Sequence, residues 1–222
     1  MIRFENVTKT FWTPGGRKTI FENANVTFPK GRSVGLLGRN GAGKTTLMSM
    51  IGGSISADSG IIHKTGSISW TVGFAGSFNR LMTGAQNTKF VARIYGVDTD
   101  ELVEFVKDFA ELGPHFYAPI QSYSSGMRSR LAFGISIGIP FDTYLVDEVT
   151  SVGDAAFKRK SRAAFMDRME TAGAIVVTHS MAQIAKLCDS GVVLENGQLT
   201  YFDDIQDAIA QHHINMGSTE DE

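Results

Sequence analysis

The chain has 222 residues, a formal net charge of -2, 42% hydrophobic residues and 20% charged residues. This composition is typical of one sizeable soluble domain, or of one domain with an inserted subdomain. The net charge of -2 excludes an overall positive electrostatic field of the kind that attracts nucleic acid. We also find no apolar run near the roughly 20 residues that span a bilayer, and no signal peptide. The single cysteine, Cys188, predicts a reducing compartment and a place in the core.

The first 70 residues are predicted to be mainly β-structure. Residues 2–11 and 24–31 alternate like strands, 13–18 form a turn or loop, and 33–37 form a short buried strand. A further hairpin is expected over 59–70, turning near residues 64–66.

From about residue 76 to 140 the spacing becomes helical. One face of 101–112 carries Leu102, Phe105, Val106, Phe109 and Leu112. Strands resume over 143–148, 174–180 and 191–202, the last with the hairpin signal Asn196-Gly197. A helix and an acidic tail are expected over 203–222. The fold class is therefore α/β, with a helical block inserted into the core.

The segment GLLGRNGAGKTTL, residues 35–47, contains the pattern G-x-x-x-x-G-K-[ST], from Gly38 through Gly43, Lys44 and Thr45. Phosphate oxygens need many donors at close range, and backbone N–H groups supply them where glycine lets the loop curl tightly. The following helix adds a positive N-terminal end. Lys44 can reach the β- and γ-phosphates, and the Thr45 hydroxyl can ligate Mg²⁺. The pattern predicts a nucleoside triphosphate site.

Two acids end the strand FDTYLVDE. Asp147 can hold the shell of Mg²⁺, and Glu148 can act as general base toward the attacking water. The alternative is two solvated acids at a strand end.

The segment YSSGMRSRLAF, residues 123–133, places two serines and a glycine before an amphipathic helix. Ser124 can be an ordinary N-cap. A capped N-terminus with free N–H groups is also an anion site.

Taken in order, these motifs resemble those of the ATPase subunit of an ABC transporter, from residue 2 to about residue 202. GRNGAGKTT matches Walker A, TYLVDE matches Walker B, and YSSGM resembles the signature sequence with Ser124 and Gly126 kept. The resemblance implies a P-loop NTPase (RecA-like) core with an N-terminal antiparallel β-subdomain and an inserted helical subdomain. Residues 1–222 would form a single ABC ATPase domain.

The resemblance assigns roles to further residues. His179 resembles the switch histidine, Asp154 the D-loop aspartate, and Phe11 the aromatic ring that stacks on adenine, with Trp12 as a rival. The family usually has a glutamine at the start of the helical insert. Here Asn79 takes that place, one methylene shorter, and Ser77 is the alternative.

The implied catalytic residues are Glu148, His179 and Lys44, and the implied metal ligands are Thr45, Asp147 and Asn79. The implied nucleotide-binding residues are Phe11, Gly38, Asn40, Gly41, Ala42, Gly43, Lys44, Thr45, Thr46, Ser124, Gly126 and Asp154. The implied ligands are ATP and Mg²⁺. Since the chain carries one copy of each motif, a homodimer would be needed to complete a site.

The subfamily resemblance is to the ATPases that export capsular polysaccharide in Gram-negative bacteria. It rests on SISW, GFAGSFNRLMTGAQNTKFVARIYG, YSSGMRSRLAF and DEVTSVGD. Exporters of O-antigen or teichoic acid share much of this pattern. The short stretch after the last hairpin leaves no room for an added carbohydrate-binding domain, which favours the capsule group. We expect a polytopic permease partner, no nucleic acid, and a peripheral place on the cytoplasmic face of the inner membrane.

Two other classes remain as alternatives. A soluble ABC ATPase acting on DNA or the ribosome would show a long coiled coil or two cassettes. A GTPase would show N-K-x-D, which this sequence lacks.

Overall fold

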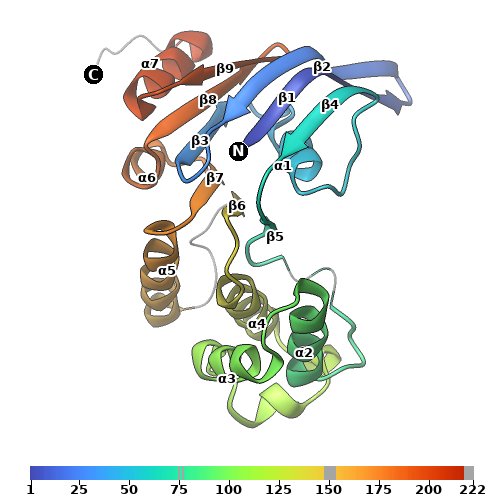
Figure 1. Ribbon diagram of the computed structural model, residues 1–222, viewed down its shortest axis with the longest axis vertical. Helices are drawn as coiled ribbons and strands as arrows, with labels where there is room; N and C mark the ends of the chain where they lie inside the picture. Colours follow the sequence, from blue (N-terminus) through green and yellow to red (C-terminus); the bar gives the residue numbers. More distant parts are fainter. Residues whose placement is uncertain (75, 77, 148–153, 218–222) are drawn as a thin grey trace. The chain divides into compact units, whose positions relative to one another are not determined.

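The computed structural model describes residues 1–74, 76, 78–147 and 154–217 (Figure 1). These residues form two compact units. The sheet unit contains residues 1–69, 142–147 and 171–217, and the helical unit contains 70–141 and 154–170.

The strands of the chain are β1 (Ile2–Thr13), β2 (Gly16–Phe28), β3 (Ser33–Gly38), β4 (Ser59–Lys64), β5 (Ile68–Thr71), β6 (Thr143–Asp147), β7 (Gly173–Val177), β8 (Ser190–Glu195) and β9 (Gln198–Phe202). The α-helices are α1 (Lys44–Ile51), α2 (Gly84–Tyr95), α3 (Thr99–Ala110), α4 (Ser125–Gly138), α5 (Ala155–Met169), α6 (Met181–Leu187) and α7 (Ile205–Met216). Two 3₁₀ turns, η1 (Gly113–Tyr117) and η2 (Ile120–Ser122), precede α4.

A three-stranded antiparallel sheet has the order β2-β1-β4. Its hairpin is longer than the sequence predicts. Thr13 pairs with Gly16, so the turn contains only Pro14 and Gly15, and β2 begins inside the expected loop over 13–18.

The prediction of a hairpin over 59–70 is wrong. β4 pairs with β1, whereas β5 lies beside β6 in the other sheet. The reason lies at Ser67, whose backbone N–H and hydroxyl both donate to the Asp142 carboxylate, at 2.9 and 3.0 Å. These bonds direct the chain after β4 toward β6.

The second sheet has six strands in the order β5-β6-β7-β3-β8-β9. β3 pairs in parallel with both β7 and β8. The predicted Asn196-Gly197 hairpin is confirmed, because β8 and β9 pair antiparallel around these two residues and both have positive φ, 47° and 78°.

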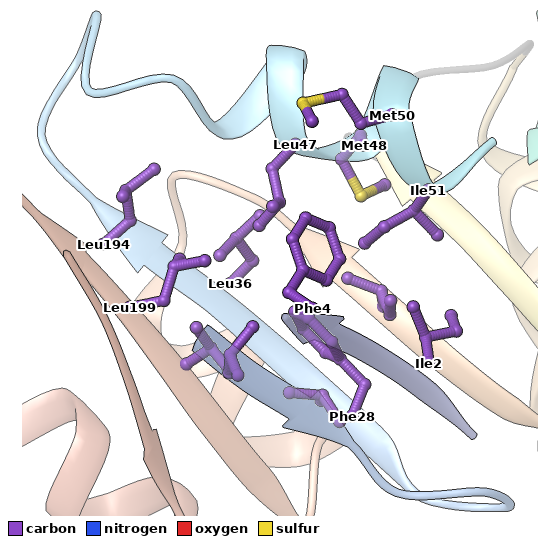
Figure 2. Packing of buried hydrophobic residues seen from close by; sticks show 14 of the residues in the cluster. Ile2, Phe4, Phe28, Leu36, Leu47, Met48, Met50, Ile51, Leu194 and Leu199 are labelled. Carbon is purple, nitrogen blue, oxygen red and sulfur yellow. The ribbon is translucent and has the colours of Figure 1, made fainter. Parts of the chain in front are cut away.

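The core of the sheet unit lies between α1 and the strands. Figure 2 shows Leu47, Met48 and Ile51 of α1 beside Phe4 of β1 and Leu36 of β3, all at most 4% exposed. Burial of each such side chain stabilises the fold by about 1.5–3 kcal/mol. The packing fixes the start of α1 and with it the glycine loop. Cys188 is buried as predicted, and burial raises the pKa of its thiol to about 12.

The helical unit is built on aromatic contacts. The apolar face predicted for 101–112 is confirmed at Leu102, Val106 and Phe109, whereas Phe105 is 37% exposed. The Phe109 ring stacks on Phe133 of α4 at 5.9 Å and meets Phe157 of α5 edge-on at 5.6 Å. These contacts join α3, α4 and α5.

Among the described residues, no helix is both long and apolar enough to cross a bilayer.

Candidate nucleotide-binding site

The glycine loop joins β3 to α1 and uses backbone that only glycine adopts without strain. Gly38, Gly41 and Gly43 have φ of 153°, 78° and 113°. A Cβ at Gly38 would lie 2.5 Å from the carbonyl oxygen of Leu194, and a Cβ at Gly43 would lie 2.3 Å from Cγ2 of Ile20. The backbone angles therefore favour glycine at all three positions, and close packing also requires it at Gly38 and Gly43.

Lys44 begins α1 and turns back over the loop. Its Nζ donates to the carbonyl oxygen of Gly38, and to that of Arg39 at 3.0 Å. Burial lowers the pKa of Lys44, and the charge of Asp147 acts in the opposite direction. The ammonium group is thus held at the loop with a carboxylate nearby.

A cavity of about 450 Å³ lies beside the loop. We call it the phosphate-loop cavity. It is lined by Lys18, Ile20, Asn40, Gly41, Gly43, Lys44, Thr45, Thr46, Asp147, Val177 and His179. Asp147 and His179 reach the cavity from the ends of two neighbouring parallel strands. Asp147 ends β6 opposite Val177 of β7, and His179 follows the end of β7 by two residues.

The lining of this cavity fits a magnesium–triphosphate group. Lys44 and the N-terminus of α1 supply positive charge. The Thr45 hydroxyl and the Asp147 carboxylate are oxygen ligands of the kind that Mg²⁺ takes. The structure therefore brings eight of the predicted site residues to one cavity: Asn40, Gly41, Gly43, Lys44, Thr45, Thr46, Asp147 and His179.

The register of the long hairpin puts Phe11 and Trp12, the two candidates for adenine stacking, on opposite faces of the sheet. Phe11 pairs directly with Lys18, and directly paired residues lie on one face of a sheet. Lys18 and Ile20, two residues apart, both line the cavity. Phe11 thus lies on the same face of the hairpin as Lys18, with Lys9 Nζ 5.2 Å from its ring centroid, although Phe11 is not among the residues that line the cavity. Trp12 pairs with Arg17 on the other face and is 84% exposed.

Lys18 and Ile20 are cavity residues that the sequence reasoning missed. The expected loop over 13–18 contains Lys18, and no strand is predicted at Ile20, so neither residue could be assigned to a face of a sheet. The available signal was the apolar Ile20-Phe21 pair, which begins four residues after the Pro14-Gly15-Gly16 turn signal and is compatible with a tight hairpin.

Ser124, Gly126 and Asp154 lie in the helical unit, at the N-termini of two helices. Ser124 is the N-cap of α4 and accepts from the Met127 N–H at 3.2 Å, as predicted. Asp154 is the N-cap of α5. Hydrogen bonds from the backbone, that of Phe157 first, and the charge of Arg130 lower the pKa of Asp154.

Asn79 also lies in the helical unit, where its polar groups hold a turn. Its side-chain oxygen accepts from the Leu81 N–H at 3.0 Å, and its backbone N–H donates to Asn87. The oxygen that would contact Mg²⁺ is therefore engaged locally. Its rival Ser77 and the expected base Glu148 lie outside the described residues.

Comparisons with known proteins agree on one family. The family model described as ABC transporter matches residues 21–151. The chain is 47% identical to the polysialic acid transport ATP-binding protein KpsT of Escherichia coli, covering 96% of this chain and 97% of that protein. It is 41% identical to the capsule polysaccharide export ATP-binding protein CtrD of Neisseria meningitidis serogroup B, over 94% and 96%.

A solved structure gives the same fold. It is a dimeric, post-hydrolysis state of the ATP-binding cassette MJ0796 bound to ADP and Pi, with a TM-score of 0.76 at 19% identity over 92% of this chain and 99% of that one. The predicted α/β P-loop NTPase fold is confirmed. The chain belongs to the ATP-binding subunits of the ABC transporter family, and it is similar to those that export capsular polysaccharide.

Proposed function

We propose that this chain hydrolyses ATP as the nucleotide-binding subunit of an exporter of capsular or related cell-surface polysaccharide. The observation that carries the proposal is the phosphate-loop cavity, where Lys44, Thr45, Asp147 and His179 meet. Two near full-length relatives that are named for polysaccharide export support the cargo.

In the proposed mechanism the loop N–H groups and Lys44 hold the β- and γ-phosphates of ATP, with Asn40, Ala42 and Thr46 completing the loop surface. Phe11 stacks on the adenine. Thr45 and Asp147 would hold Mg²⁺, which would neutralise charge on the transferring phosphoryl group. Glu148, oriented with His179, would take a proton from the attacking water as the water oxygen bonds to the γ-phosphorus and the bond to the bridging oxygen of the departing ADP breaks.

We further propose that residues 1–222 act as one ATPase domain that works as a homodimer. The N-terminus of α4, with Ser124 and Gly126, would face the γ-phosphate held by the partner's loop. An N-terminus with a hydroxyl suits this task because its N–H groups and helix dipole attract anions. Asp154 would help to place the D-loop in the same interface.

We place the permease contact on α2 of the helical unit. A cavity of about 270 Å³ there is lined by Trp70, Phe74, Phe78, Asn87, Phe90, Val91, Ile94 and Tyr95. Phe90 and Ile94 are 54% and 60% exposed and lie one helical turn apart. An apolar hollow with exposed aromatic walls suits a short amphipathic helix. Such a contact would hold the subunit at the cytoplasmic face of the inner membrane.

Purified protein should hydrolyse ATP, and Lys44→Ala should not.

Fractionation after co-expression with a candidate permease tests the membrane contact. We expect the chain to sediment with membranes only when the permease is present, and Phe90→Glu or Ile94→Glu to release it. Ile214→Glu, on a side chain that is 69% exposed in the sheet unit, is the matched control. Retention of the α2 variants, or firm binding without the permease, would count against this surface.

The cargo is tested in a capsule-producing strain that lacks its own export ATPase. The chain, supplied with its permease, should restore polymer at the cell surface, and the Lys44→Ala variant should leave polymer inside the cell. ATP hydrolysis without any surface polymer would keep the ATPase and reject the cargo.

A further inference from the structure

The N-terminus of α5 is tied to α4 by an arginine that none of the motifs accounts for. Arg130 Nη2 donates to Asp154 Oδ2 at 2.6 Å. The other carboxylate oxygen, Oδ1, accepts from the N–H groups of Ala156 and Phe157 at 3.0 and 2.9 Å. Both oxygens of Asp154 are therefore engaged within its own subunit.

The same guanidinium packs on the first turn of α5. Its Cζ lies 4.6 Å from the centroid of the Phe157 ring, and the Arg130 side chain is only 20% exposed. Arg130, Asp154 and Phe157 thus form a closed set of contacts, in which the carboxylate binds both the cation and the backbone of the residue that stacks on it. A charge-assisted bond on a partly buried arginine is stronger and more directional than an exposed ion pair.

A second acid joins the cluster from the end of α3. Glu111 Oε2 lies 3.7 Å from Arg130 Nη1, and Glu111 Oε1 accepts from Lys160 Nζ at 2.6 Å. Lys160 also donates to the carbonyl oxygens of Asp108 and Phe109, so it caps the C-terminus of α3. Glu111 has a φ of 53°, a conformation that glycine usually takes at this position. These bonds hold it there.

The cluster therefore has a short arm and a long arm. The short arm joins Arg130 to Asp154, and the long arm joins Glu111 to Arg130 and Lys160. The short arm links α4 directly to the N-cap of α5, whereas the long arm links α4 to the body of α5 through Glu111. Ser124 caps the N-terminus of α4, six residues or about 9 Å of helix before Arg130.

We infer that Arg130 is a positioning residue for ATP hydrolysis, which sets the N-cap Asp154 of α5 against the helix that carries Ser124. This inference rests on the proposed function. In the sequence, Asp154 follows the expected base Glu148 by six residues. The role is one of placement, because the contacts of Arg130 are with Asp154, Phe157 and Glu111, and Arg130 is not among the residues that line the phosphate-loop cavity.

The test compares Arg130→Met, Arg130→Lys, Asp154→Asn, the Arg130→Met/Asp154→Asn double variant and Glu111→Gln. Turnover, KM for ATP and thermal unfolding are measured for each. Asp154→Asn keeps an acceptor for the α5 cap and loses the charge that pairs with Arg130. Glu111→Gln removes the charge of the long arm only, and is the matched control.

Arg130→Met should lower kcat on the order of 10- to 100-fold, the effect expected of misplaced catalytic groups, with KM unchanged. Arg130→Lys should recover part of the loss. Asp154→Asn should match Arg130→Met, and the double variant should be no worse than either single one. Glu111→Gln should lower the melting temperature and keep kcat within about twofold.

Wild-type turnover in a folded Arg130→Met protein would overturn the inference, and so would additive losses in the double variant or a Glu111→Gln loss as large as that of Arg130→Met. If Arg130→Met fails to fold, Arg130→Lys and Asp154→Asn test the inference in its place, and wild-type kcat in both folded variants would overturn it. An inactive wild type would refute the proposed function instead. If the wild type hydrolyses ATP and Lys44→Ala does not, the proposed function stands, whatever the result for the Arg130 variants.

Discussion

Replacing Gly43 with alanine tests how the glycine loop is held. Gly43 has a φ of 113°, and a residue with a Cβ in a left-handed conformation costs roughly 1–2 kcal/mol. The new Cβ would also lie 2.3 Å from Cγ2 of Ile20. This methyl is attached to a β-branched carbon and cannot swing away easily. Overpacking of this kind typically adds 1–3 kcal/mol, so the total loss of unfolding free energy is about 2–5 kcal/mol.

Gly41→Ala is the matched control. Gly41 has a φ of 78°, and no heavy atom lies within 4 Å of the Cβ position. This variant therefore carries the backbone strain alone, about 1–2 kcal/mol. Thermal unfolding measures the difference, at about 2–4 °C for each kcal/mol in a chain of this size.

In an Ile20→Ala background, Gly43→Ala should cost less unfolding free energy than it does in the wild type. The cost of Gly41→Ala should be the same in both backgrounds. Equal losses for the Gly43 and Gly41 variants, or no relief from Ile20→Ala, would refute the packing argument.

Three further predictions follow from the site and the core. Glu148→Gln should keep ATP binding and lower turnover about 10²–10⁴-fold, because an amide cannot accept the proton of water, and gel filtration with ATP should show a dimer; unchanged turnover would remove Glu148 from its role. Ser124→Arg should abolish turnover and keep ATP binding at the subunit's own loop, since Lys44 and Thr45 are untouched; activity in the folded variant would leave Ser124 as an N-cap only. Cys188 should resist alkylation at about pH 8.5 until urea unfolds the chain, because burial raises its pKa to about 12 and keeps the thiol protonated. Since the folded pKa lies above the unfolded one, the contribution of Cys188 to stability is complete below the unfolded pKa and is lost as pH rises toward 12; rapid labelling of the folded chain would contradict this.

The glycine loop was predictable because its chemistry is local. Gly38, Gly43 and Lys44 lie within seven residues, so their spacing alone indicates a phosphate site. The Asn196-Gly197 turn and the cap at Ser124 are local signals as well, and the structure has both.

Pairings between distant segments were not predictable in this way. The turn signal near residues 64–66 predicts a hairpin. In the structure, hydrogen bonds between Ser67 and Asp142, 75 residues apart, place β5 beside β6 instead. The place of Lys18 in the cavity depends on hairpin register. The Arg130–Asp154 pair spans 24 residues and appears only once α4 and α5 are packed.

The central claim is that two copies of this chain make one ATPase site from the loop of one copy and the α4 N-terminus of the other. Mixing two inactive variants, Lys44→Ala and Ser124→Arg, tests it directly. The mixed dimer would contain one intact site, built from the loop of the Ser124→Arg copy and from Ser124 of the Lys44→Ala copy. The account predicts that ATP hydrolysis, absent from each folded variant alone, returns on mixing; two folded variants that stay inactive together would contradict it.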